Sequence, residues 1–165
     1  MLNVSLNKRS VSIKKLLADF NKMDKATVDV GHFASQGIHP TSGLPYPELM
    51  ALHHFGDPSQ NIPARPVRTI VAHGAVRTLK APSLRGELMD WGKAQERHKA
   101  LQSVLEAMGK LLVADGKAVF GSSQLRANSD KTVQIKGFNS PLIERGDLQR
   151  HYAYKTSLDD TVKET

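Results

Sequence analysis

The stretch NSDKTVQIKGFNSPLIERGDLQRHYAY, residues 128–154, is the most specific part of the chain and decides the predicted fold. Apolar and polar residues alternate over 132–136 and again over 148–155, which is typical of strands with one buried face. Between them, glycines and a proline punctuate a turn-rich connector around the apolar pair Leu142-Ile143. The stretch therefore predicts two strands joined by a compact, rigid connector.

The segments before this stretch predict a scaffold of helices and one further strand. Residues 26–33 alternate in the same way and predict a strand near the N-terminus. Helical spacing of apolar residues predicts a helix over 10–23 and a short helix over 46–55 ending at Gly56. It also predicts a helix from Pro66 that is broken at Gly74 and at the Ala81-Pro82 step, and a long helix over 83–112 that bends or splits near Gly92. The predicted fold is α+β, with a small antiparallel or mixed sheet built from N- and C-terminal strands and packed by a long helix and shorter helices.

The length and composition predict one domain over residues 1–165, ending in a polar, frayed tail over 157–165. No apolar run is long enough to span a membrane, and the N-terminus shows no apolar segment of a secretory signal. The chain has no cysteine, which excludes disulfides and Cys-ligated zinc. These features predict a protein without a membrane partner.

Positive charge is concentrated in particular parts of the chain, whose net charge is +7. Residues 62–100 carry eight Lys/Arg against three Asp/Glu, whereas residues 26–61 carry no Lys or Arg. A basic surface attracts polyanions in general, so two interpretations remain, a solvated face and contact with nucleic acid. The candidate DNA-facing residues are Arg65, Arg68, Arg77 and Lys80, with the alternative that Arg65 is structural and pairs with a carboxylate.

Motifs that would indicate an enzyme are absent from the sequence. There is no phosphate-binding glycine loop, zinc-protease motif or nucleophile elbow, so we expect neither catalysis nor a cofactor. The best metal-like group is His53-His54 with Asp57, but adjacent helical residues point about 100° apart. Packing is therefore the favoured interpretation and no metal is predicted, although a metal-dependent hydrolase remains a rival that rests on these histidines.

The order of four short motifs resembles a known family. The motifs are LHHFG at 52–56, IPARP at 62–66, KTVQIKG at 131–137 and PLIERGDL at 141–148. In this order they resemble the small tail-completion and neck proteins of tailed bacteriophages, including the Mu-type virion morphogenesis family. The resemblance extends over roughly residues 28–154, and its motifs are structural.

The resemblance implies a structural protein of the virion, assembled in the host cytoplasm, and no catalysis. Such proteins form a homo-oligomeric ring, often six-fold, around the DNA channel where head meets tail. One side of the ring would contact a portal, adaptor or head-closure protein, and the other a tail terminator or the tail tube. Basic residues lining the channel would touch packaged DNA without reading its sequence.

The connector is the candidate subunit interface, with Phe138, Pro141, Leu142, Ile143, Gly146 and Leu148 as its residues. Two interpretations of Leu142 and Ile143 stay open, a contact with a neighbouring subunit and a plug in the chain's own core. Two alternative functions also stay open. One is a tail-terminator or head-closure ring, and the other, suggested by charge alone, is a free protein that binds DNA non-specifically.

Overall fold

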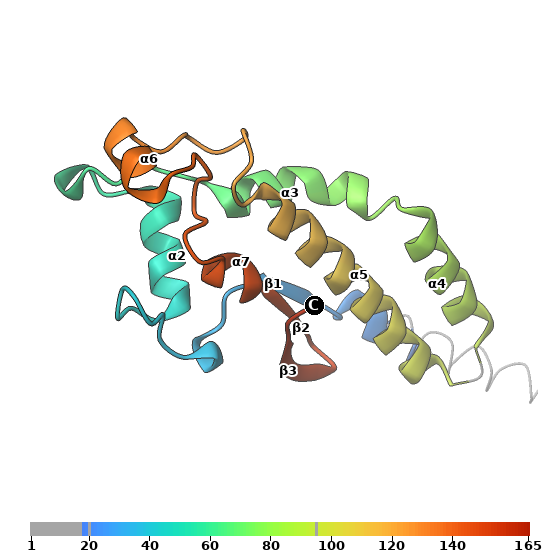
Figure 1. Ribbon diagram of the computed structural model, residues 1–165. Helices are drawn as coiled ribbons and strands as arrows, with labels where there is room; N and C mark the ends of the chain where they lie inside the picture. The colour runs from blue at the N-terminus through green and yellow to red at the C-terminus, as the bar shows by residue number, and fades with distance from the viewer. Residues whose placement is uncertain (1–17, 20, 95) are drawn as a thin grey trace, which may run out of the picture.

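The fold is α+β, which confirms the predicted fold class (Figure 1). The computed structural model describes residues 18–19, 21–94 and 96–165. The elements follow in the order β1 (Val28–Gly31), η1 (Ala34–Gln36), α2 (Tyr46–Phe55), η2 (Pro58–Gln60), α3 (Val67–Thr78), α4 (Pro82–Lys93), α5 (Arg97–Val119), α6 (Asp130–Lys136), α7 (Asp147–Arg150), β2 (Ala153–Thr156) and β3 (Asp159–Lys163). The expected helix over 10–23 lies for the most part outside the described residues.

The sheet brings the two ends of the described chain together. Its strand order is β1-β2-β3, and both pairs are antiparallel. Val28 lies opposite Thr156 at one end of the first pair, and Gly31 lies opposite Ala153 at the other. The predicted N-terminal strand and the last part of the predicted C-terminal strand are therefore confirmed as sheet neighbours.

Helix α5 packs on this sheet through two glycines that share one face. Gly109 and Gly116 are seven residues apart, so they lie almost above one another on the helix. Each is buried, and each lies directly against an aromatic ring of β2 or its approach, Tyr154 for Gly109 and Tyr152 for Gly116. The absence of a side chain at these two positions lets the rings reach the helix backbone.

The predicted long helix is split into α4 and α5, which pack against each other (Figure 1). Leu84 and Trp91 of α4 join three buried residues of α5, Leu101, Val104 and Leu105, in one core cluster. The expected break near Gly92 is confirmed, because Ala94 has the extended conformation that ends α4. The helical spacing of apolar residues continues through the break because the apolar faces of α4 and α5 pack against each other.

The prediction of a strand over residues 132–136 is wrong, because these residues belong to helix α6. The Ser129 hydroxyl accepts a hydrogen bond from the Thr132 N–H at 3.3 Å and caps the helix start. Gly137, with φ of 77°, ends the helix in the left-handed conformation. These local caps outweigh a short alternation whose supposed inner residue, Ile135, is 78% exposed.

The C-terminal predictions need two further corrections. The strand expected over 148–155 begins as helix α7, and only its last residues enter β2. The tail expected to fray over 157–165 instead contains β3. Lys163 holds β3 in place, since its Nζ contacts Glu106 Oε1 at 2.7 Å and Asp159 Oδ2 at 2.9 Å. The polar composition of residues 157–165 suggested a frayed tail, but polar side chains form ion pairs that hold β3 at the edge of the sheet.

Helix α2 has the bounds that the sequence predicts and ends at Gly56. Gly56 has φ of 74°, and a Cβ there would lie 2.6 Å from the Ala64 backbone nitrogen. Helix α3 follows Pro66 as expected but runs through Gly74 to Thr78. Gly74 therefore does not break the helix, because a single glycine costs only about 1 kcal/mol relative to alanine.

We predict that Gly109→Ala destabilises the fold by about 1–3 kcal/mol, because the new methyl group overlaps the Tyr154 ring. Gly86→Ala in α4 is the matched control, since nothing lies within 4 Å of a Cβ there. That control should gain up to about 1 kcal/mol from helix propensity. Urea unfolding of both variants measures the difference, and equal stability of the two would contradict the close packing of α5 on β2.

Candidate functional site

Arg65 joins three segments that are distant in sequence. Its side chain is 7% exposed, and its Nε donates to the Arg126 carbonyl at 2.9 Å. Its Nη2 donates to the Ala127 carbonyl at 3.3 Å and to Asn128 Oδ1 at 3.1 Å. The Arg65 backbone N–H also donates to the His53 carbonyl at 2.7 Å. The proline link is thereby tied to both α2 and the loop before α6.

These contacts correct the assignment of Arg65 to a DNA-facing set. Its guanidinium is buried against backbone carbonyls and is not presented to solvent. The structural alternative holds, but with carbonyl and amide oxygens as partners where a carboxylate was expected. A planar guanidinium suits this role because it presents several N–H donors in fixed directions.

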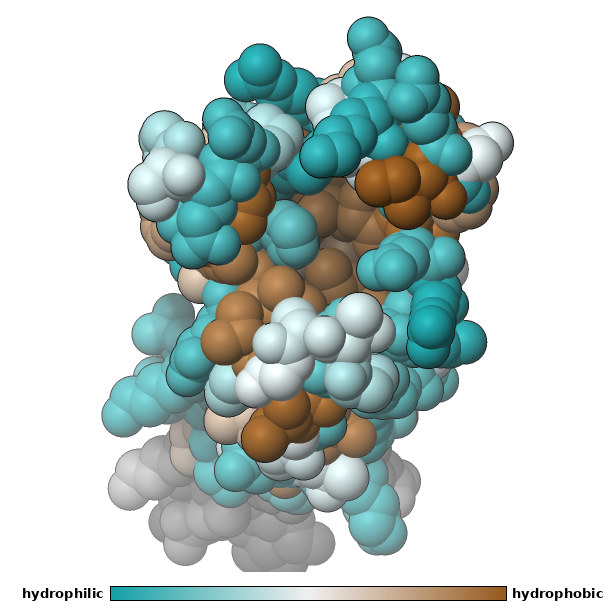
Figure 2. Space-filling model, turned by 60° about the vertical axis from the view of Figure 1, so that its left-hand side comes forward, coloured by the Kyte–Doolittle hydropathy of each residue, from teal (hydrophilic) through white to brown (hydrophobic). Residues whose placement is uncertain are grey.

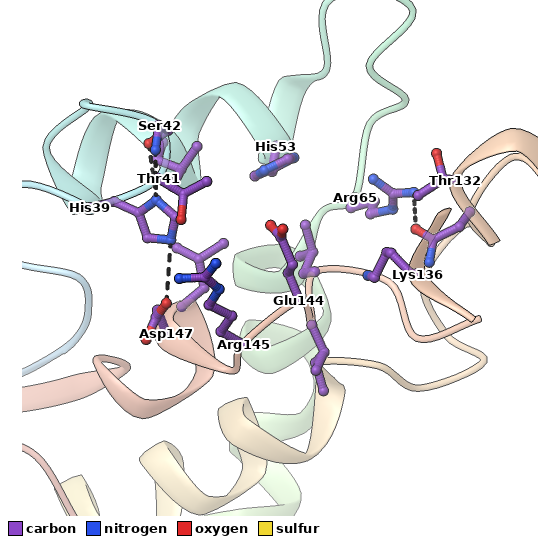
Figure 3. A pocket seen from close by; sticks show the side chains of 15 residues that line it. His39, Thr41, Ser42, His53, Arg65, Thr132, Lys136, Glu144, Arg145 and Asp147 are labelled. Atoms are coloured by element: carbon purple, nitrogen blue, oxygen red, sulfur yellow. Dashed lines mark hydrogen bonds and ion pairs between the residues drawn. The ribbon is translucent and has the colours of Figure 1, made fainter. Parts of the chain in front are cut away.

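A hollow of about 280 Å³ lies between α2 and the connector (Figure 3). Figure 2 shows this side of the molecule as hollowed, with hydrophobic surface gathered in the depression and hydrophilic residues around it. The lining includes His39, His53, Arg65, Lys136, Leu142, Ile143, Glu144, Arg145, Asp147 and Leu148. The IPARP link and the PLIERGDL motif thus meet at one cavity, although they are far apart in the sequence.

Three of the six candidate interface residues line this hollow, Leu142, Ile143 and Leu148. Leu148 is buried, and both Leu142 and Ile143 pack, half-buried, against the main core cluster. Leu142 and Ile143 therefore pack against the chain's own core, as the second interpretation predicts, and each also lines the hollow.

The other three interface candidates have separate positions. Pro141 is buried, and Gly146 has φ of 80° where α7 begins. Phe138 is exposed, with the Lys136 ammonium 4.9 Å from its ring centroid. Of the six residues, Phe138 alone is an exposed large apolar side chain, so it is the member of the set most available to another molecule.

The connector is fastened from three sides. The Gly121 N–H donates to the Pro141 carbonyl at 2.9 Å, and Lys136 Nζ donates to the Ser140 carbonyl at 3.1 Å. The Asn128 N–H donates to Asn139 Oδ1 at 3.0 Å. These bonds hold Leu142 at φ of 62°, a left-handed conformation that is costly for a residue with a branched side chain. The connector is therefore a rigid wall of the hollow.

Two histidines beside the core are held in the neutral form. Burial lowers the pKa of His32 to about 4, and its Nε2–H donates to the Leu148 carbonyl at 2.8 Å. Burial, followed by the nearby Arg65 charge, lowers the pKa of His53 to about 4. His54 lies apart from His53, in a second hollow with Phe55 and Arg68. Within the described residues, no three His, Asp or Glu side chains form a group able to hold a metal ion.

The structure does not bring all three remaining DNA-facing candidates together. Arg68, Arg77 and Lys80 are all exposed. Arg68 and Arg77 are nine residues apart on α3, which places them on opposite sides of the helix. Arg68 lines the hollow beside α2, whereas Arg77 lines a different one beside Gln124. A single patch of the four predicted residues does not exist.

Two exposed apolar residues were not predicted from the sequence. Ile135 on α6 is 78% exposed and Phe55 at the end of α2 is 76% exposed. Ile135 belongs to the run that predicts a strand over 132–136, which α6 contradicts. The signal that could have found it is the helix-capping pattern of Ser129 and Gly137.

Comparisons of the chain with protein-family models, with curated proteins and with solved structures found no match. Across the part of the chain that the structure describes, no helix is both long and apolar enough to cross a membrane. The function proposed below therefore depends on the motif order and on the geometry of the hollow.

We predict that Arg65→Gln lowers the free energy of unfolding by about 1.5–3 kcal/mol, because charge-assisted hydrogen bonds to three acceptors are lost. Arg68→Gln removes the same charge from an exposed side chain nearby and should change stability by less than about 0.5 kcal/mol. Chemical denaturation of the two variants measures both values. Equal effects would show that the Arg65 contacts do not hold the link.

We predict that stability falls as the pH drops from about 6.5 towards 4. In this range the unfolded chain, whose histidines titrate near their ordinary pKa of about 6.5, binds more protons than the folded chain with His32 and His53 near 4. The stability that these residues contribute is complete above about pH 6.5 and is lost on acidification. Urea unfolding at about pH 7 and pH 5 measures the loss.

A single substitution tests the assignment to the buried histidines. His53→Gln should reduce the loss between the two pH values, because it removes one of the two buried side chains that gain a proton on unfolding. An unaltered loss in His53→Gln would contradict the assignment.

Proposed function

We propose that this protein is a non-enzymatic structural subunit of a tailed-phage virion. In this proposal it forms a ring, six-fold by resemblance, at the head–tail junction around the DNA channel. It joins a portal, adaptor or head-closure protein to a tail terminator or the tail tube. One observation carries most of the argument, namely that residues of the IPARP and PLIERGDL motifs of the resemblance line one hollow, where Arg65 of IPARP is bonded to residues 126–128.

The surface around this hollow supports an assembly role. Phe55, Ile135 and Phe138 are large apolar side chains exposed on α2, α6 and the start of the connector. Large apolar side chains that are exposed in a single chain are candidates for contact with a partner. In a closed ring this surface would meet a different surface of the next subunit, because ring contacts are heterologous. A stable contact would bury about 800 Å² on each partner.

The rigid connector also fits this role. A wall whose backbone is fixed by hydrogen bonds presents the same shape in each copy, and little conformational entropy is then lost when copies associate. We therefore assign the connector the task of holding the interface in shape, and Ile135 and Phe138 the task of touching the neighbour. Of the six predicted interface residues, this division keeps Phe138 as a contact and gives Leu142 and Ile143 a place in the wall.

The proposal is tested by inactivating the gene in the phage or prophage genome that encodes it. We expect DNA-filled heads and complete tails to accumulate unjoined, and the protein to be found in purified particles of the intact phage. Tails of uncontrolled length would instead indicate a tail terminator, and heads that lose their DNA would indicate a head-closure ring. Normal joined particles that lack the protein would refute a virion role.

We predict that the pair Ile135→Asp/Phe138→Asp blocks assembly without unfolding the subunit, because both side chains are exposed in the single chain. Leu142→Asp should instead destabilise the subunit, because Leu142 packs on the core. Thermal unfolding and light scattering after size-exclusion chromatography separate the two effects.

The control for each single change of the pair is Gln134→Asp, which adds one negative charge at an exposed position of the same helix. It should stay folded and assemble normally. Assembly of the Ile135→Asp/Phe138→Asp pair at the level of this control would contradict the assigned surface.

A further inference from the structure

One stretch of the chain is basic and free of acidic residues, and its nearest carboxylate from another element is Asp115 of α5, which accepts a hydrogen bond from the Thr78 hydroxyl. Residues 58–86 carry five Lys/Arg and no Asp or Glu. Arg65 is buried, and the other four, Arg68, Arg77, Lys80 and Arg85, are exposed. Exposed cations without acidic neighbours in sequence keep their charge available to a partner. The basic stretch therefore offers an anion-binding surface along α3 and the start of α4.

Three of the four exposed cations gather where α3 meets α4. Arg77 is in the last turn of α3, Lys80 is in the short link, and Arg85 is in the first turn of α4. Arg68 lies on the other side of α3 and does not join them. We call the set His73, Arg77, Lys80, Arg85 and Gln124 the α3–α4 joint.

A surface hollow of about 430 Å³ supplies the other two members of the joint. It is lined by Ile70, His73, Gly74, Arg77 and Gln124, so helix α3 and the loop after α5 both contribute to it. The polar groups in this lining are an imidazole, a guanidinium and a side-chain amide, and no carboxylate is among them. Each of these groups can donate a hydrogen bond to a phosphate oxygen.

We propose that the α3–α4 joint binds the phosphodiester backbone of duplex DNA. The inference rests on the proposed ring function and names the surface through which each subunit touches DNA. Arg, Lys and Gln side chains are the usual phosphate contacts of proteins on a duplex. Residues 67–86 contain no Phe, Trp or Tyr on which unstacked bases would lie, so the joint fits a duplex backbone better than a single strand.

The number of cations sets the expected salt dependence. Each phosphate that a protein cation neutralises contributes about −0.9 to the slope of log K against log salt concentration. Contacts from Arg77, Lys80 and Arg85 therefore predict a slope of about −3 for one subunit. Contacts to the backbone alone also predict equal affinity for duplexes of unrelated sequence.

The test is a DNA titration of the full chain, followed by fluorescence anisotropy, between about 50 and 200 mM salt. Arg77→Glu/Arg85→Glu reverses two cations of the joint, and Lys110→Glu/Lys131→Glu reverses two exposed cations elsewhere with the same change in net charge. We expect the joint pair to weaken binding about tenfold or more and to reduce the slope by about 2, and the control pair to change the slope little. Arg77→Gln/Arg85→Gln, which adds no negative charge, should give the same reduction in slope.

Three results would overturn the inference. The first is an equal reduction of the salt dependence in the joint and control pairs, which would show that DNA is attracted by the overall charge of the protein and not by the joint. The second is a preference for one duplex sequence that the joint pair leaves intact. The third is binding to vesicles of anionic phospholipid, or to an acidic peptide, without binding to duplex DNA. Circular dichroism of each variant checks that the subunit remains folded.

Oligomeric state, measured on the same samples, separates this inference from the ring function. Suppose that the protein remains monomeric and is not found in particles, but that Arg77→Glu/Arg85→Glu reduces the salt dependence of DNA binding as expected. This result would refute the ring function and support the DNA-binding surface. If the protein instead assembles and joins heads to tails while this variant keeps the full salt dependence, the ring function is supported and the DNA-binding surface is refuted.

Discussion

The guanidinium of Arg65 holds together the parts of the molecule from which the candidate site is built. Its donors satisfy carbonyl and amide oxygens of residues 126–128, and the same loop continues into α6. Its backbone N–H binds the His53 carbonyl of α2. Without this buried cation those acceptors would lose their partners, which costs more than an exposed hydrogen bond is worth. The hollow, the connector and the exposed residues of α6 all depend on the position of this loop.

The second constraint is the close approach of α5 to the sheet. Gly109 and Gly116 let Tyr154 and Tyr152 lie directly against the helix backbone. Helix α5 also carries the core stripe that packs α4, so a single long helix connects the sheet to the α3–α4 side of the molecule. The position of the basic joint relative to the sheet is therefore set by packing of the core, because close-packed interiors leave little freedom to shift.

The two proposed surfaces differ in chemistry and in place. The surface near the hollow combines exposed apolar residues with a rigid wall, which suits a protein partner. The joint between α3 and α4 combines cations with polar donors, which suits phosphate. Figure 1 shows α6 and the junction of α3 with α4 at separate parts of the molecule, with most of α3 between them. A ring subunit needs this separation, because the surface that meets DNA and the surface that meets a neighbour must be available at once.

The sequence by itself determined the features that rest on local signals: helix α2 with its Gly56 cap, the break after Gly92, and the strand at residues 28–31. It also carried the motif order on which the proposed function rests. The helix over residues 132–136 also rests on a local signal, its Ser129 and Gly137 caps, which the short alternation obscured. Only the tertiary structure decided that the C-terminal residues form β3 and that Arg65 binds carbonyls, because the deciding partners are a neighbouring strand and a distant loop. A polar composition or a lone arginine is compatible with several such partners, and packing selects one.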